Sequence, residues 1–136
     1  MSFVIDPSMA AAWILPDERN EEADAVLLRL DGDVACVPSL FWHEARSLLI
    51  KAERRGPIPT GGAGAFMSRL WRLPIEDMGA GTDAAVFALA GKHGLSSYDA
   101  TYLALALAKN CPLATFEGKL AAAARQERVV VLGTPT

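Results

Sequence analysis

Short runs of apolar residues alternate along the chain with longer stretches in which apolar residues recur every three or four positions. The short runs predict buried strands, and the longer stretches predict amphipathic helices that pack against them. The strands are expected at residues 3–5, 34–37, 73–75, 113–115 and 129–132. Because helices separate the strands, the pattern predicts an α/β fold in which helices cover both faces of a mostly parallel sheet of about five strands.

Proline and glycine mark the ends of several predicted helices. Pro16 ends the first helix, Gly56 ends the third, and Gly94 is placed to end the fifth. The helices are expected at residues 8–15, 18–30, 39–55, 60–70, 82–93, 96–110 and 117–127. No repeat or low-complexity segment interrupts this order, so the 136 residues are expected to form a single domain, 1–136.

The composition is typical of a globular protein of the cytoplasm. Hydrophobic residues make up 51% of the chain, enough to bury a core without disulfides or a structural metal. Cys36 and Cys111 stand far apart in apolar sequence and are expected to be free thiols in a reducing compartment. No signal peptide or membrane-spanning run is recognisable, so no membrane association is expected.

The net charge limits how the protein could bind nucleic acid. A net charge of −3 argues against a large basic binding surface. It is compatible with an enzyme that holds a nucleic acid through metal ions, because a cluster of acidic ligands itself makes the balance negative.

Four acidic residues stand at the ends of predicted strands or in the helices next to them. Asp6 follows the first strand, and Glu44 lies in the helix after the second. Asp99 opens the helix that leads to the fourth strand, and Glu117 follows that strand. Since ligands of open parallel sheets collect at the carboxyl ends of the strands, these side chains are expected to meet in one cleft.

A carboxylate cluster next to apolar sequence is costly unless a cation compensates it. Ligands that are all oxygen favour Mg²⁺ or Mn²⁺, and the presence of only two histidines argues against zinc. Such an ion lowers the pKa of bound water and neutralises charge on a phosphodiester that is being displaced. The acids therefore predict metal-dependent phosphodiester chemistry.

Taken one at a time, the four acids have simpler interpretations. Asp99 could cap its helix, and Asp6 could be a turn residue before a proline. Glu44 could pair with a basic neighbour on its helix surface, and Glu117 could interact with a helix dipole. The combined placement of all four at strand ends favours a functional site.

Basic and aromatic residues allow two interpretations each. A basic row along and beyond the third helix is either a solvated face or a set of phosphate contacts. The tryptophans are expected to be anchors of the core or of an interface rather than platforms for stacked bases. These residues are Arg46, Lys51, Arg54 and Arg55, and Trp13, Trp42 and Trp71.

Four segments resemble the PIN-domain family, in particular toxins of the VapC type. The segments are VIDPSMAAAW, WHEARSLLIKAERRG, LSSYDATYLALALAKNCPLATFEGKLAAAA and VVVL. They cover nearly the whole chain in order. The resemblance implies a three-layer α/β/α sandwich and an Mg²⁺-dependent endoribonuclease that is the toxin of a type II toxin–antitoxin system. It also implies an RNA substrate, a homodimer and a cognate antitoxin that occupies the groove and inhibits cleavage.

The resemblance carries over to individual residues. The family's first three acids match Asp6, Glu44 and Asp99, and hydroxyl positions near the family's site match Ser8 and Thr115 as supporting residues. The fourth family acid is usually Asp, whereas this chain has Glu117, whose side chain is longer by one methylene, about 1.5 Å of reach. This departure leaves open whether position 117 is a ligand and whether one or two metal ions bind.

Two other functions remain open from the sequence. The first is a binding module of the same fold that pairs with an antitoxin but cleaves poorly because of Glu117. The second is a phosphohydrolase that acts on small substrates, although the segment after Asp6 lacks the second aspartate of haloacid-dehalogenase phosphatases. Metal-dependent cleavage of RNA separates the leading hypothesis from the first, and activity on a phosphomonoester would favour the second.

Overall fold

Parallel strands form the centre of the molecule in a computed structural model that describes residues 1–133. Within these residues the sheet has five strands in the order β3-β2-β1-β4-β5, and every neighbouring pair is parallel. The strands are β1 (Ser2–Ile5), β2 (Val34–Val37), β3 (Ile75–Asp77), β4 (Leu113–Thr115) and β5 (Val131–Gly133). The predicted parallel sheet is confirmed.

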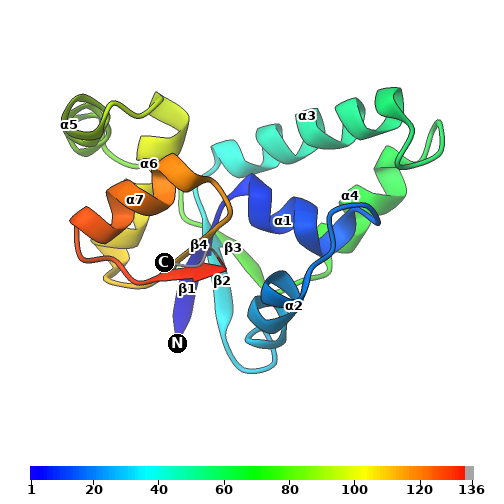
Figure 1. Cartoon of the computed structure of the whole chain (residues 1–136), viewed down its shortest axis with the longest axis horizontal. Coiled ribbons are helices and arrows are strands. Elements are labelled where there is room, and N and C mark those ends of the chain that lie inside the picture. Colours follow the sequence, from blue (N-terminus) through cyan, green and yellow to red (C-terminus); the bar gives the residue numbers. More distant parts are fainter. Residues whose placement is uncertain (134–136) are drawn as a thin grey trace.

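Helices cover both faces of the sheet, as the alternating pattern predicts (Figure 1). One layer contains α1 (Pro7–Ile14), α2 (Glu21–Leu28), α3 (Leu40–Arg55) and α4 (Ala63–Trp71). The other contains α5 (Asp83–His93), α6 (Ser97–Lys109) and α7 (Gly118–Gln126). No helix in residues 1–133 combines the length and the apolar character that a membrane span requires.

The long helix α3 illustrates how the sequence builds these layers. Its buried residues recur every three or four positions, so that one face packs on the core. They are Phe41, Trp42, Ala45, Leu49 and Ala52. Gly56 ends the helix with a φ of 101°, a left-handed conformation that favours glycine.

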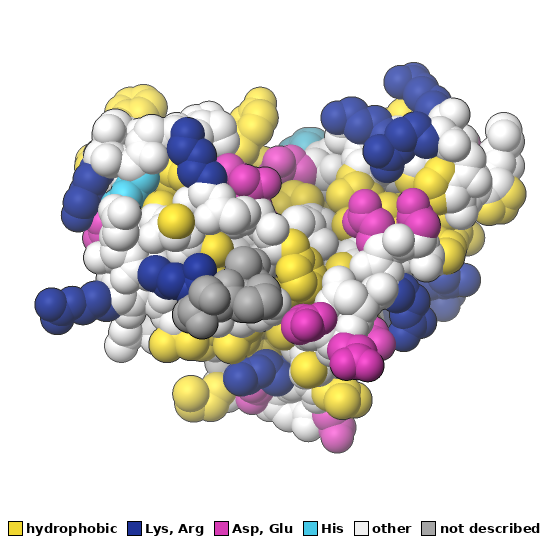
Figure 2. Space-filling model, in the orientation of Figure 1, with side chains coloured by type: hydrophobic (Ala, Val, Ile, Leu, Met, Phe, Trp, Pro, Cys, Tyr) yellow, Lys and Arg dark blue, Asp and Glu magenta, His cyan; other side chains and the backbone are white. Residues whose placement is uncertain are grey.

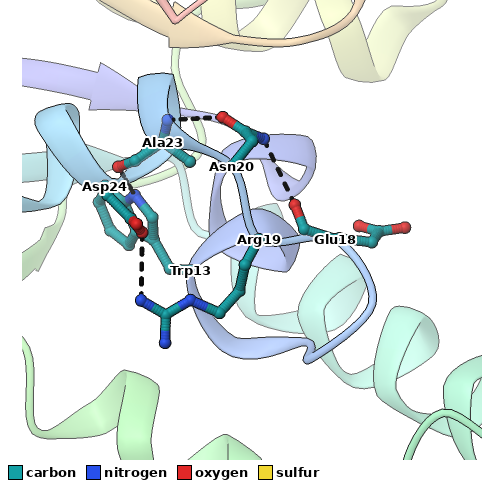
Figure 3. A network of polar contacts seen from close by, with 6 residues as sticks. All are labelled: Trp13, Glu18, Arg19, Asn20, Ala23 and Asp24. Carbon is teal, nitrogen blue, oxygen red and sulfur yellow. Dashed lines mark hydrogen bonds and ion pairs between the residues drawn. The ribbon is translucent and has the colours of Figure 1, made fainter.

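The connection between α1 and α2 explains why α2 begins later than predicted (Figure 3). The pattern predicted a helix from residue 18, but α2 begins at Glu21 because the side chain of Asn20 accepts a hydrogen bond from the Ala23 N–H at 2.8 Å. The indole N–H of Trp13 donates to the carbonyl oxygen of Ala23 at 3.0 Å. This bond ties the start of α2 to the end of α1.

Two strands also lie one or two residues later than predicted. β3 begins at Ile75 because Leu73 closes the turn after α4 and Pro74 has no N–H to donate to a neighbouring strand. β5 begins at Val131 because the N–H of Val129 donates to the end of α7. In both places the apolar run starts before the chain leaves the preceding turn.

The tryptophans divide into buried and exposed members. Trp13 and Trp42 are core residues, each only 6% exposed, as predicted. Trp71 stacks on Trp42 with ring centroids 3.8 Å apart and an interplanar angle of 5°, yet it is 60% exposed. Both cysteines are free, and Cys36 is buried.

Candidate active site

The order of the strands reverses between β1 and β4, and this point defines the candidate site. From β1 the chain continues outward to β2 and β3, and from β4 it continues outward on the other side to β5. Ligands of open parallel sheets bind outside the carboxyl ends of strands at such a point. Figure 2 shows a notch there, between the α5–α7 side and the α3 side, with acidic side chains in it.

Asp6 lies at the carboxyl end of β1 and is only 3% exposed. Its Oδ1 accepts hydrogen bonds from the Ser8 hydroxyl at 2.7 Å and the Met9 N–H at 3.1 Å, and its Oδ2 accepts one from the Thr115 hydroxyl at 2.6 Å. Burial raises the pKa of Asp6 to about 6, the charge of Asp99 adds to this, and the hydrogen bonds oppose it. Asp6 caps α1 and also carries a destabilised buried charge.

Ser8 and Thr115 lie beside Asp6, where the resemblance placed supporting hydroxyls. Their oxygens are 3.4 Å apart. The Ser8 hydroxyl accepts a hydrogen bond from the N–H of Phe116 at 2.9 Å, and the Thr115 hydroxyl accepts one from the N–H of Glu117 at 2.9 Å. The two hydroxyls therefore link Asp6 to the loop that presents Glu117.

Asp99 lies in the first turn of α6 without acting as its cap. Ser96 is the N-cap, because its hydroxyl accepts a hydrogen bond from the Asp99 N–H at 3.1 Å. The pKa of Asp99 is raised by partial burial and by the charge of Glu117, while Lys119 opposes the rise. The interpretation of Asp99 as a helix cap is therefore wrong.

Glu44 is held by a hydrogen bond from the opposite layer. The hydroxyl of Tyr102 donates to its Oε1 at 2.6 Å. Burial and the charge of Asp99 raise the pKa of Glu44, and the bond from Tyr102 opposes this. Among residues 1–133 no ion pair joins Glu44 to Arg46 or Lys51, so its interpretation as a surface ion-pair partner is wrong.

Glu117 occupies the N-cap position of α7, but its side chain makes no capping hydrogen bond. Its side chain is exposed, and its charge acts on Asp99. The charge of Asp99 also raises the pKa of Asp6 and Glu44, so Asp99 is the common electrostatic neighbour of the other three acids. The four predicted acids therefore gather around one notch.

The carboxylates do not form a ready-made coordination shell. Within the described residues 1–133, no three His, Cys, Asp or Glu side chains are arranged to hold a metal ion as they stand. Asp6 and Glu44 instead accept hydrogen bonds from protein hydroxyls. The chemistry of the donors nevertheless fits a hard divalent cation, because all are carboxylate oxygens and the pKa values of Asp6, Glu44 and Asp99 are raised.

Comparison with known proteins identifies the family. A model of the PIN domain matches residues 3–126 of the chain. This chain belongs to the PIN-domain family. Ribonuclease VapC3 of Pyrobaculum aerophilum is 32% identical to it over 139 residues, a match that covers 99% of this PIN domain protein and all of its relative.

Solved structures share the fold at low sequence identity. PAE2754 from Pyrobaculum aerophilum has a TM-score of 0.73 at 19% identity, covering 96% of this chain and 83% of that one. VapBC2 from Rickettsia felis, bound to a promoter DNA fragment, has a TM-score of 0.66 at 13% identity, covering 96% of this chain and 97% of that one. VapC20 from Mycobacterium tuberculosis, a sarcin–ricin loop cleaving toxin, has a TM-score of 0.61 at 19% identity, covering 89% of this chain and 94% of that one. The PIN fold predicted from the sequence is confirmed.

Tyr102 is the residue of this PIN domain site that sequence reasoning missed. Tyr102 is 1% exposed, and its hydroxyl lies near the carboxylates of Glu44, Asp6 and Asp99. Burial is the largest cause of its raised pKa, followed by the hydrogen bond to Glu44 and the charges of the three carboxylates. Its position three residues after Asp99 places both side chains on one face of α6. That spacing was the available signal, but a tyrosine in an apolar helix resembles an ordinary core residue.

Asp77 was also missed, although it serves the fold rather than the acidic notch. It ends β3, and its Oδ1 accepts hydrogen bonds from the Ser39 hydroxyl at 2.8 Å and the Gly79 N–H at 2.9 Å. These bonds lower the pKa of Asp77. The Asp-x-Gly spacing is a turn signal that could have located it.

The buried charge of Asp6 predicts a pH dependence of stability. Its folded-state pKa of about 6 lies above the ordinary 3.8, so its stabilising contribution is complete below pH 3.8 and is lost as the pH rises through 6. Without metal, the unfolding free energy of the wild type relative to Asp6→Asn should increase by up to about 3 kcal/mol between pH 7 and pH 4. Urea denaturation of both proteins measures this difference. A difference that stays constant with pH would contradict the assignment.

The longer side chain at position 117 gives a second prediction. If Glu117 is a ligand, Glu117→Asp should preserve or increase the rate of cleavage, and Glu117→Gln should lower metal affinity and rate together. The physical reason is that Gln keeps the length but removes the charge that acts on Asp99. Cleavage rates against Mg²⁺ concentration compare the three proteins. A Gln variant whose metal dependence overlays the wild type would remove Glu117 from the site.

Proposed function

We propose that this PIN domain protein is a metal-dependent endoribonuclease and the toxin of a type II toxin–antitoxin pair. The observation that carries the proposal is the gathering of Asp6, Glu44 and Asp99 at the strand-order reversal, where partial or full burial raises the pKa of each. The similarity to a ribonuclease over nearly the full chain supports RNA as the substrate.

The residues of the notch would hold Mg²⁺ or Mn²⁺. A bound ion of this kind supplies an activated water and neutralises charge on the phosphodiester. Asp6 is fixed by three hydrogen bonds and still has an acceptor position on Oδ2, since that oxygen accepts only the Thr115 hydroxyl among the described contacts. Asp99 provides negative charge from α6, and the exposed Glu117 is the candidate for an outer ligand of the ion.

Tyr102 and the two hydroxyls orient the acids. Tyr102 keeps Oε1 of Glu44 directed toward α6, and burial of its ring keeps water away from that side of the notch. Ser8 and Thr115 keep Asp6 in one orientation. The protein thus fixes two of the three principal carboxylates before any substrate binds.

We also propose a cognate antitoxin partner, a homodimer and a location in the cytoplasm. Structural neighbours that are VapBC assemblies support the antitoxin. The exposed ring of Phe87 on α5, 71% accessible, supports contact with a second copy. Free thiols at Cys36 and Cys111 suit a reducing compartment. Light scattering of the purified protein tests the homodimer directly.

Metal binding should stabilise the fold, because it relieves repulsion among the gathered carboxylates. Millimolar Mg²⁺ or Mn²⁺ should raise the melting temperature of the wild type and have less effect on Asp99→Asn. Thermal melts and titration calorimetry measure this without relying on activity. Equal melting temperatures with and without metal, together with no heat of binding, would count against the site.

The substrate class is tested by cleavage of a panel of structured and single-stranded RNAs in Mg²⁺, with a chromogenic phosphomonoester in parallel. Metal-dependent RNA cleavage without phosphomonoester hydrolysis is expected. Hydrolysis of the phosphomonoester alone would favour the small-substrate phosphohydrolase. Antitoxin binding without cleavage of any RNA would favour the binding module.

A further inference from the structure

A groove of about 760 Å³ opens beside the acidic notch and includes Glu44 in its wall. It follows one face of α3, because the lining residues Leu40, Glu44, Leu48, Lys51 and Arg55 recur every three or four positions. From residue 40 to residue 55 the helix rises about 22 Å. The groove is therefore long enough for several nucleotides of an extended strand.

The two ends of the groove differ in charge. Glu44 lies at the end next to the acidic notch, and Lys51 and Arg55 lie toward the end of α3. Glu18, from the connection between α1 and α2, also lines the groove. Neither cation forms an ion pair with another residue among the described 1–133. Figure 2 shows basic side chains gathered over that end of α3. In a chain of net charge −3, this concentration of unpaired positive charge fits an anionic ligand.

An exposed aromatic ring stands at the acidic end of the groove. Tyr98 lines the groove, is 60% exposed and directly precedes Asp99. It is held in the first turn of α6, whose N-cap bond from Ser96 fixes the backbone there. A flat ring beside a candidate cleavage site is suited to stack on an unpaired base.

We infer that this groove binds the single-stranded RNA that flanks the cleaved bond, with a base stacked on Tyr98 and backbone phosphates against Lys51 and Arg55. The inference rests on the proposed ribonuclease function. The apolar floor at Leu15 and Leu48 would also admit a protein segment. A carboxylate and an exposed ring at one end of the groove and two cations toward the other favour RNA, because one strand offers a phosphodiester, a base and further phosphates.

The test measures RNA binding separately from cleavage. A fluorescent ten-nucleotide single-stranded RNA is titrated with protein carrying Asp6→Asn, which keeps the RNA intact, and the Kd is measured at several salt concentrations. In this background, Tyr98→Leu should weaken binding about five-fold or more, and Tyr98→Phe should stay within about two-fold. Trp71→Leu, which removes a ring of the same exposure, 60%, on α4 outside the groove, is the matched control and should have no effect.

The cations are tested by the double variant Lys51→Gln/Arg55→Gln. Loss of two phosphate contacts to a single strand should weaken binding and reduce the slope of log Kd against log salt by about 1.4. The control Arg29→Gln/Arg72→Gln makes the same charge change outside the groove and should leave the slope close to that of the background. Circular dichroism and melting curves verify that each variant is folded.

The outcomes separate this inference from the proposed function. If the wild type cleaves RNA but the Tyr98 and cation variants bind like the background, the groove inference is wrong, and a protein partner becomes the better occupant. If the groove variants lose RNA binding but the wild type cleaves no RNA in Mg²⁺, the subsite stands and the ribonuclease proposal fails.

Discussion

Asp6→Asn and Asp99→Asn are each expected to lower the rate of RNA cleavage by at least about a hundred-fold while the domain remains folded. Both changes remove a charge from the acidic notch with little change in shape. Asp99 is the common electrostatic neighbour of the other three acids, so its loss should weaken metal binding most. Asp6→Asn also removes a buried charge, so its melting temperature at neutral pH should be equal to or above that of the wild type.

A matched control uses a carboxylate far from the notch. Asp24→Asn on α2 removes a charge that pairs with Arg19 on the surface (Figure 3). It should cleave RNA at the wild-type rate, since exposed ion pairs of this kind contribute little. Wild-type cleavage by both Asp6→Asn and Asp99→Asn would show that the notch is not the catalytic site.

Tyr102→Phe is expected to lower the cleavage rate about ten-fold or more at limiting Mg²⁺. The change keeps the buried ring but removes the hydroxyl that donates to Glu44 at 2.6 Å. Glu44 would then lose its fixed orientation, so the required Mg²⁺ concentration should rise and saturating metal should restore part of the rate. Cleavage against Mg²⁺ concentration, with calorimetry of metal binding, measures both effects.

A purely structural role of Tyr102 would give a different result. Loss of one buried hydrogen bond to a carboxylate would lower the unfolding free energy by about 1.5–3 kcal/mol without changing metal affinity. Leu103→Ala on the same helix, also fully buried, controls for destabilisation alone. If Tyr102→Phe and Leu103→Ala have the same metal dependence as the wild type, Tyr102 does not position Glu44.

Much of the fold is predictable because its strands are buried on both faces. Phe3, Val4 and Ile5 form an unbroken apolar run for this reason, and Leu113 and Ala114 do the same in β4. The boundaries are harder to predict, because they depend on individual hydrogen bonds. The hydrogen bond to the Asn20 side chain sets the start of α2, and Pro74 keeps β3 from beginning before Ile75. Apolar periodicity predicts neither boundary.

The positions of the acids are predictable because strand ends of a parallel sheet meet at one edge. Asp6, Asp99 and Glu117 follow from that topology, while their roles as ligands stay predictions. Tyr102 is harder to find, because its contact with Glu44 joins residues 58 positions apart in the sequence. The orientation of the carboxylates is equally hard to predict, because hydrogen bonds to Asp6 and Glu44 come from elements far away in the sequence.

The central claim is that the acidic notch binds a divalent cation that RNA cleavage requires. The most direct measurement is the cleavage rate of a single-stranded RNA by metal-stripped protein as Mg²⁺ is added back, for the wild type and Asp99→Asn. We predict no cleavage in chelator, a saturable rise with Mg²⁺ for the wild type, and no comparable rise for Asp99→Asn. Cleavage at full rate in chelator, or equal metal-dependent cleavage by both proteins, would contradict the claim.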